Sequence, residues 1–137
     1  MQGGGGKRNE MTAGGLCGFG TLLDPSITTA DNLSGQVLAK KGELPEIRTE
    51  CVIEINLMKN MVAGDGEHPD KIHPLRNNEM LMVNVATSTS VGIVKGVEKG
   101  KANLHLRLPI CANPGQRVSL SRRVGARWRL IGHGTIQ

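Results

Sequence analysis

Aromatic side chains are almost absent from this sequence, which contains one phenylalanine, one tryptophan and no tyrosine among 137 residues. Domains that bind unpaired nucleotides stack successive bases on several exposed aromatic rings. Phe19 and Trp128, far apart in the chain, cannot form such a surface. A base-stacking recognition sheet is therefore excluded, and charge is the main property through which this chain can select a partner.

Closely spaced cysteines and long hydrophobic runs are also lacking. The three cysteines, Cys17, Cys51 and Cys111, are widely separated and form no C-x-x-C pair, which argues against a disulfide framework and against a zinc knuckle. No apolar run approaches the roughly 18 residues of a membrane span, and residues 1–10 lack the core of a signal peptide. We expect a soluble cytoplasmic protein that makes no membrane contact.

Acidic residues are missing from the last part of the chain. The sequence has 17 Lys+Arg and 12 Asp+Glu, for a net charge of +5, and residues 115–137 contain five arginines and no acid. A localised basic stripe is typical of a surface that binds a polyanion or an acidic protein, although arginines on a solvated strand face give the same pattern. The candidate docking residues are Arg117, Arg122, Arg123, Arg127 and Arg129.

Alternating apolar and polar residues predict a chain of short strands. Residues 48–57, 102–110, 117–124 and 127–136 alternate, residues 79–86 are apolar on both faces, and residues 91–97 pair with them across a turn at 87–90. A further strand is expected at residues 33–40. About six strands at short spacing, without a helical period, predict an all-β fold, a small closed antiparallel barrel.

The two final strands are joined by a tight connection at Gly125 and Ala126. The alternation predicts that Trp128 and Leu130 face inward, with Trp128 as the large aromatic anchor of the core. The same alternation directs Arg122 inward, which requires either a β-bulge there or a partner at the barrel mouth.

No set of residues assembles a catalytic or metal site. The glycine-rich start runs into Lys7, but Arg8 follows where a phosphate-binding loop needs Ser or Thr, and no strand precedes the glycines. The long loop 61–78 contains Asp65, Glu67 and Asp70 near two histidines, without the ordered spacing of metal ligands. We expect neither enzymatic activity nor a cofactor in this chain.

Several sequence blocks together resemble the gamma subunit of eukaryotic and archaeal translation initiation factor 2. They are residues 14–25 (GGLCGFGTLLDP), 42–47 (GELPEI), 78–85 (NEMLMVNV), 108–112 (LPICA), 120–124 (LSRRV) and 127–132 (RWRLIG). The resemblance covers residues 13–136. It implies the C-terminal part of a second β-barrel domain at 13–45 and a complete third domain at 46–137, a Greek-key barrel of a translational GTPase. Residues 1–12 lie outside the resemblance, and their glycine content predicts a flexible leader.

That resemblance also implies a function for the parent protein, which delivers methionyl initiator tRNA to the small ribosomal subunit in a GTP-dependent ternary complex. GTP and magnesium would belong to a nucleotide domain that this chain lacks. The implied partners are the alpha and beta subunits of the factor, the initiator tRNA, the RNA of the small ribosomal subunit and an assembly chaperone.

Two hypotheses for the barrel remain open from the sequence. In the first, the five arginines contact the phosphates of ribosomal RNA or tRNA, which gives affinity without sequence readout. In the alternative, the barrel docks a partner subunit or an assembly chaperone without direct RNA contact.

Overall fold

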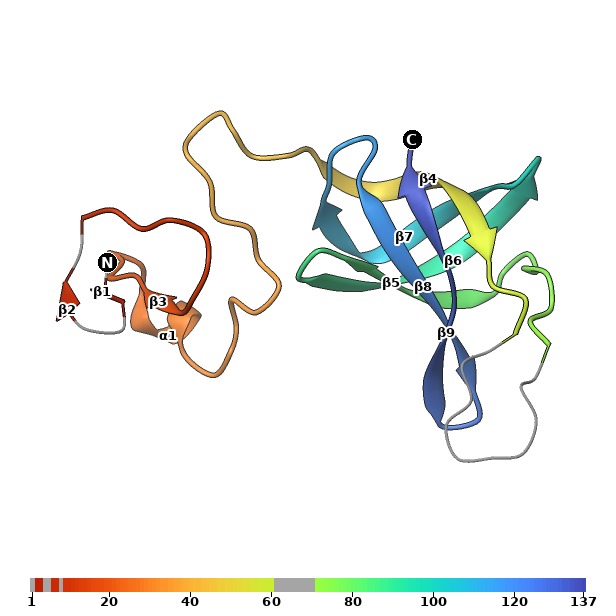
Figure 1. Ribbon diagram of the computed structural model, residues 1–137, viewed down its shortest axis with the longest axis horizontal. Helices are drawn as coiled ribbons and strands as arrows, with labels where there is room; N and C mark the ends of the chain where they lie inside the picture. The colour runs from red at the N-terminus through yellow and green to blue at the C-terminus, as the bar shows by residue number, and fades with distance from the viewer. Residues whose placement is uncertain (1, 4–5, 8, 61–70) are drawn as a thin grey trace. The chain divides into compact units, whose positions relative to one another are not determined.

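The computed structural model describes residues 2–3, 6–7, 9–60 and 71–137. The chain divides into two compact units, Met1–Leu33 and Ser34–Gln137, and the second contains the barrel (Figure 1). Among the described residues no helix is long and apolar enough to cross a membrane.

The first unit holds a small sheet and one short helix. Its sheet has the order β2-β1-β3, from β1 (Gln2–Gly3), β2 (Gly6–Lys7) and β3 (Cys17–Gly18). The helix α1 (Pro25–Thr28) begins at Asp24, whose carboxylate accepts hydrogen bonds from the backbone N–H and the hydroxyl of Ser26. These bonds hold the pKa of Asp24 below its ordinary value.

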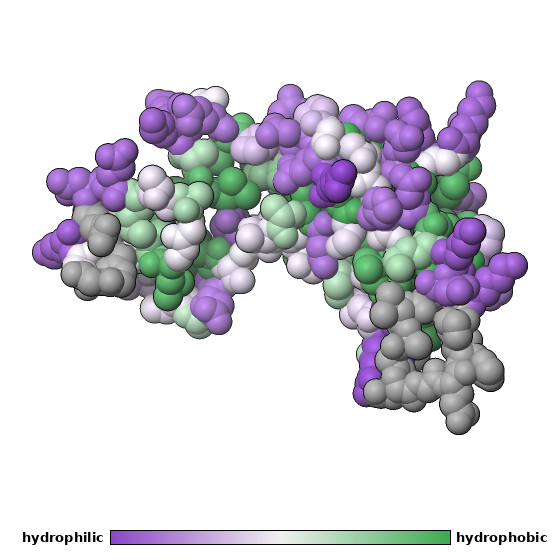
Figure 2. Space-filling model, in the orientation of Figure 1, coloured by the Kyte–Doolittle hydropathy of each residue, from purple (hydrophilic) through white to green (hydrophobic). Residues whose placement is uncertain are grey.

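Large apolar side chains of this first unit lie in solvent. Leu16 is 91% exposed and Leu22 is fully exposed, and Phe19 and Leu23 are half-exposed. Figure 2 shows green apolar surface on this unit, at the left of the view. The unit therefore has no buried hydrophobic core of its own among the described residues.

The strand expected at residues 33–40 does not form, so that prediction is wrong. Residues 19–46, all of which the structure describes, contain the helix α1 and no strand. Gly35 and Gly42 have positive φ angles of 77° and 89°, values that interrupt an extended strand. This segment contacts the barrel where the Ser88 hydroxyl donates to the Gly35 carbonyl at 2.5 Å, and where the Ala112 N–H donates to the Glu46 carbonyl at 3.3 Å.

The second unit is a closed barrel of six antiparallel strands, which confirms the predicted fold class. The strands, in chain order, are β4 (Ile47–Leu57), β5 (Met80–Val85), β6 (Ser88–Glu98), β7 (Lys101–Cys111), β8 (Arg117–Val124) and β9 (Arg127–Ile136). Around the barrel their order is β4-β7-β6-β5-β8-β9, and β9 pairs with β4 to close it. Because β4 pairs with β7 and β9 and not with β5, the next strand in the chain, the strand order is that of a Greek key.

Three hairpin turns use positive φ angles. Lys99 and Gly100 (φ 48° and 80°) join β6 to β7, and Gly125 (φ 60°) lies in the tight connection from β8 to β9. Ala86 (φ 52°) forms the turn between β5 and β6. That turn is shorter than the predicted one at 87–90, because β6 already begins at Ser88.

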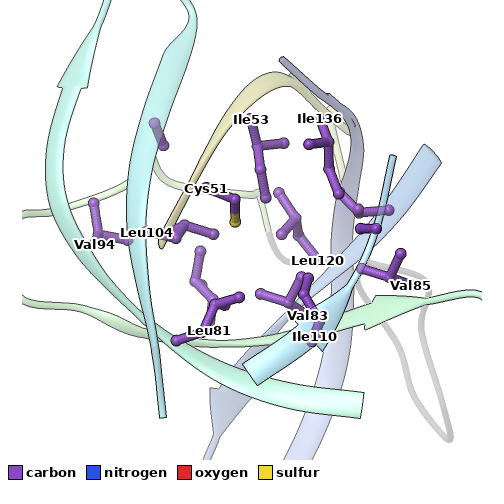
Figure 3. Packing of buried hydrophobic residues seen from close by; sticks show 14 of the residues in the cluster. Cys51, Ile53, Leu81, Val83, Val85, Val94, Leu104, Ile110, Leu120 and Ile136 are labelled. Carbon is purple, nitrogen blue, oxygen red and sulfur yellow. The ribbon is translucent and has the colours of Figure 1, made fainter. Parts of the chain in front are cut away.

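The barrel interior is filled by aliphatic side chains (Figure 3). Ile53, Leu81, Leu104, Leu120 and Ile131 are completely buried. The buried hydroxyl of Ser90 accepts from the backbone N–H of Leu108 and donates to its carbonyl, so this polar group is satisfied.

Cys51 is part of this core, and burial raises the pKa of its thiol from 9.0 to about 11, with Arg48 acting weakly in the opposite direction. Between pH 9 and 11 the unfolded chain has lost this proton and the folded chain keeps it, so raising the pH favours unfolding. We expect a loss of about 3 kcal/mol of stability over this range that a Cys51→Ala variant does not show. Urea denaturation of both proteins at pH 8 and pH 11 measures the difference, and equal pH dependence would contradict the assignment.

Candidate functional site: the β8–β9 hairpin

A β-bulge in the last hairpin decides which way its side chains point. Leu120 of β8 pairs with Gly132 of β9, but the next residue, Ser121, pairs with Leu130, so Ile131 is an extra residue on β9. An extra residue reverses the side-chain alternation beyond it. The β9 side chains between the bulge and the hairpin turn therefore face the side opposite to the one that simple alternation predicts.

The register of the pairs assigns each side chain to a face, because directly opposed residues share one. The hairpin inner face, defined as the face that continues Leu120, carries Arg122, Val124, Arg127 and Arg129. The hairpin outer face carries Ser121, Arg123, Trp128 and Leu130. The ends of β8 and β9 project past the other strands of the barrel (Figure 1).

The prediction that Trp128 and Leu130 point inward is wrong. Leu130 is 41% exposed, Trp128 is half-buried, and the completely buried residue at this point is Ile131. Among the described residues, Trp128 belongs neither to the buried cluster nor to the half-buried apolar side chains packed against it. The bulge explains the difference, since it moves Ile131 into the core and rotates Trp128 to the opposite face.

Arg122 lies on the inner face, as strict alternation along β8 predicts, and of the two alternatives predicted for it the partner is the one found, since the extra residue of the bulge lies on β9. Its guanidinium forms an ion pair with Glu79 through two nitrogens, and each side chain is less than a fifth exposed. It also donates to the carbonyls of His73 (3.0 Å) and Pro74 (3.2 Å). Arg122 thus fastens the segment before β5 to the hairpin, and its donors are already occupied.

The other four arginines are placed differently. Arg117, opposite Thr135, lies at the far end of β8, five positions from Arg122 along the strand, so it does not join the hairpin cluster. Arg129 is half-buried opposite Arg122, and Arg127 is exposed opposite Val124. Arg123 is exposed on the outer face, and its Nε donates to the carbonyl of Gly125 at 3.3 Å.

No metal site emerges from the part of the chain that the structure describes, where no group of three His, Cys, Asp or Glu side chains is close enough to hold an ion. Asp65, Glu67, His68 and Asp70 of the long loop lie outside the described residues. His73 of the same loop contributes its backbone carbonyl to Arg122.

Sequence reasoning missed Glu79, which stands directly before an apolar strand and has no distinctive motif. It also missed the outward direction of Met80 and Met82, because residues 79–86 are apolar on both faces and give no alternation to follow. The available signal was the mismatch at Arg122, since a buried arginine requires a carboxylate.

Fold and hairpin together define a small Greek-key β-barrel domain with a localised basic end. A family model described as initiation factor eIF2 gamma, C terminal, matches residues 49–136. The chain is 48% identical over 134 residues to translation initiation factor 2 subunit gamma of Methanothermobacter thermautotrophicus, covering 98% of this chain and 32% of that protein. It is 40% identical over 137 residues to the subunit of the same name from Pyrococcus furiosus, covering 100% and 33%.

The chain therefore belongs to the initiation factor eIF2 gamma family and corresponds to its C-terminal domain. It spans about a third of the length of the curated relatives that it matches. The resemblance inferred from the sequence blocks is confirmed.

Proposed function

We propose that this chain is the C-terminal barrel region of a translation initiation factor 2 gamma protein that delivers methionyl initiator tRNA to the small ribosomal subunit. The alpha and beta subunits of the factor are the other members of this cytoplasmic assembly. The family match over residues 49–136 supports the parentage. Within the assembly, we infer that the barrel contributes a phosphate-binding surface.

The observation that carries this role is the position of Arg127 and Arg129. Both lie on the hairpin inner face, at the end that projects from the barrel, and residues 115–137 contain no acid. Among the described residues, Glu79 faces this hairpin and is paired with Arg122. The net charge of residues 115–137 is positive, which favours RNA phosphates over bases.

The proposal assigns GTP and magnesium to the nucleotide domain of the longer protein. The lysine that follows the N-terminal glycines, Lys7, is not followed by the Ser or Thr that a phosphate-binding loop uses to reach magnesium, so the residues here do not fit that ligand. We accordingly expect GTP turnover by this chain to remain at background.

Replacing Arg127 and Arg129 by alanine tests the phosphate-binding role. We expect binding of a labelled RNA hairpin, followed by fluorescence anisotropy, to weaken and its log–log salt slope to become shallower by about 1.5, because two phosphate contacts are removed. A variant with Arg107→Ala and Lys95→Ala, two exposed cations on other strands, is the matched control and should keep the wild-type slope. If the chain fails to bind RNA at low salt, or if the salt slope decreases equally in both variants, the phosphate-binding role is refuted.

A further inference from the structure

An apolar strip runs across the outside of four neighbouring strands, β6, β5, β8 and β9. In one row, Met82 pairs with Val91 and with Ser121, and Ser121 pairs with Leu130. In the next row, Met80 pairs with Ile93, and Arg123 pairs with Trp128. The outer apolar strip consists of Met80, Met82, Val91, Ile93, Trp128 and Leu130.

These six side chains occupy six of the eight outward positions in the two rows, on a barrel whose interior is already filled. Met80 is 49% exposed and Leu130 is 41% exposed, and the other four are half-buried. The only tryptophan of the chain stands here, on the outside, while the described core contains no aromatic ring. Tryptophan, methionine and arginine are the residues enriched in protein interfaces, whereas scattered single apolar residues need no explanation.

Charge on these strands has one sign. The outward positions of β5, of residues 88–93 of β6, and of β8 and β9 contain no carboxylate, and Arg117 and Arg123 lie among them. The strand β4, which pairs with β9 on the side away from β8, carries outward Glu50 and Glu54. A partner with carboxylates beside its own apolar side chains is complementary to the first surface and not to the second.

The closed barrel limits how such a partner can bind. Each of the six described barrel strands pairs on both sides, so no strand edge is free for strand addition. In a closed six-strand barrel β6 and β9 face opposite ways, so one helix can meet only the part of the strip on β5, β8 and β9, which is about 10 Å wide at about 4.8 Å per strand.

We propose that the outer apolar strip is a docking site for an acidic amphipathic helix of a partner protein. The helix lays its apolar side chains on Trp128, Leu130 and the two methionines, and its flanking carboxylates meet Arg123. This goes beyond the proposed RNA contact, which uses Arg127 and Arg129 on the other face of the same hairpin.

The chain supplies its own reporter for the test, since Trp128 is the only tryptophan and there is no tyrosine. The probe is a synthetic helical peptide of about 15 residues with leucines at i, i+3, i+4 and i+7 and glutamates beside them. We expect it to shift the Trp128 emission to shorter wavelength and to protect it from acrylamide quenching. The same peptide with lysines in place of glutamates should bind at least about tenfold more weakly.

Two variants locate the site. Leu130→Ser and Arg123→Glu should each weaken binding of the acidic peptide about tenfold or more. Leu108→Ser is the matched control, because Leu108 is 62% exposed on β7, away from the strip, and should bind the peptide as the wild type does. Thermal denaturation of each variant checks that the barrel remains folded.

Other outcomes overturn the proposal: equal binding of the acidic and basic peptides, equal losses in Leu130→Ser and Leu108→Ser, or no shift at all. A concentration-dependent dimer in sedimentation equilibrium that Leu130→Ser abolishes would instead assign the strip to a second copy of this chain. A Trp128 shift produced by the RNA hairpin alone would assign it to RNA. The Arg127→Ala, Arg129→Ala double variant should keep peptide binding, so the two proposals can fail separately.

Discussion

Replacing Gly134 by alanine is expected to destabilise the barrel by about 3 kcal/mol, although the change adds only one methyl group. A Cβ at this position would lie 2.3 Å from Cγ2 of Ile53 and 2.6 Å from the carbonyl oxygen of Glu54. Both neighbours belong to β4, and β4 is held between β7 and β9 by backbone hydrogen bonds, so it cannot move away without breaking a ladder. Overpacking of this kind is relieved only by distortion of the strand pair.

Gly132 makes the same close approach and should show the same sensitivity. Its Cβ would lie 2.5 Å from the carbonyl oxygen of Asn56 and 3.0 Å from the Cα of Leu57. Gly96 is the control: it lies in β6, a Cβ there meets nothing within 4 Å, and Gly96→Ala should change stability by less than about 0.5 kcal/mol. Urea denaturation midpoints of the three variants measure the contrast, and comparable midpoints for Gly134→Ala and Gly96→Ala would show that the close approach is unimportant.

Removing the carboxylate of Glu79 is expected to cost about 3 kcal/mol, because it leaves the guanidinium of Arg122 buried without its counter-charge. The side chains of Arg122 and Glu79 are 15% and 17% exposed, so solvent screens this pair weakly. The carbonyls of His73 and Pro74 satisfy some of the remaining donors but carry no charge to replace the carboxylate.

A double-mutant cycle separates this pair from ordinary loss of packing. Glu79→Leu with Arg122→Leu should be less destabilising than the sum of the two single changes by about 2 kcal/mol. The pair of Arg48 and Glu46, 3.6 Å apart, is the control because its carboxylate is 84% exposed, and Glu46→Ala should cost less than about 0.5 kcal/mol. Additive effects of the two leucine substitutions would refute the coupling.

Strand positions on the barrel were predictable wherever alternation was regular. Residues 117–124 and 127–136 were expected as strands from the sequence, and β8 and β9 have these bounds. The direction of Trp128 was not predictable, because one bulged residue at Ile131 reverses it and nothing in the local sequence marks the bulge. The strand expected at residues 33–40 failed for a different reason, since strand propensity without a neighbouring strand does not form a sheet.

The positive charge of the basic cluster was predictable from the sequence, but the arrangement of its arginines was only partly predictable. Five arginines without an acid identify the basic segment, and alternation singles out Arg122 among them without naming its partner. Arg122 is committed to Glu79, 43 positions earlier in the chain, and Arg117 is carried to the far end of β8. The partner of Arg122 depends on long-range strand pairing, which residue spacing does not encode, whereas the place of Arg117 follows from the extended strand alone.

Closure of the barrel between β4 and β9 has a consequence for the synthesis of the protein. The first barrel strand, β4, has the last strand, β9, as one of its two neighbours, through pairs such as Ile53 with Ile136. During translation, β4 leaves the ribosome long before β9 exists, and until then one side of β4 has no hydrogen-bonding partner. Contacts so distant in sequence slow folding and leave an exposed strand edge in the meantime. The nascent chain is therefore most vulnerable to misassembly in the interval between the emergence of β4 and the completion of β9.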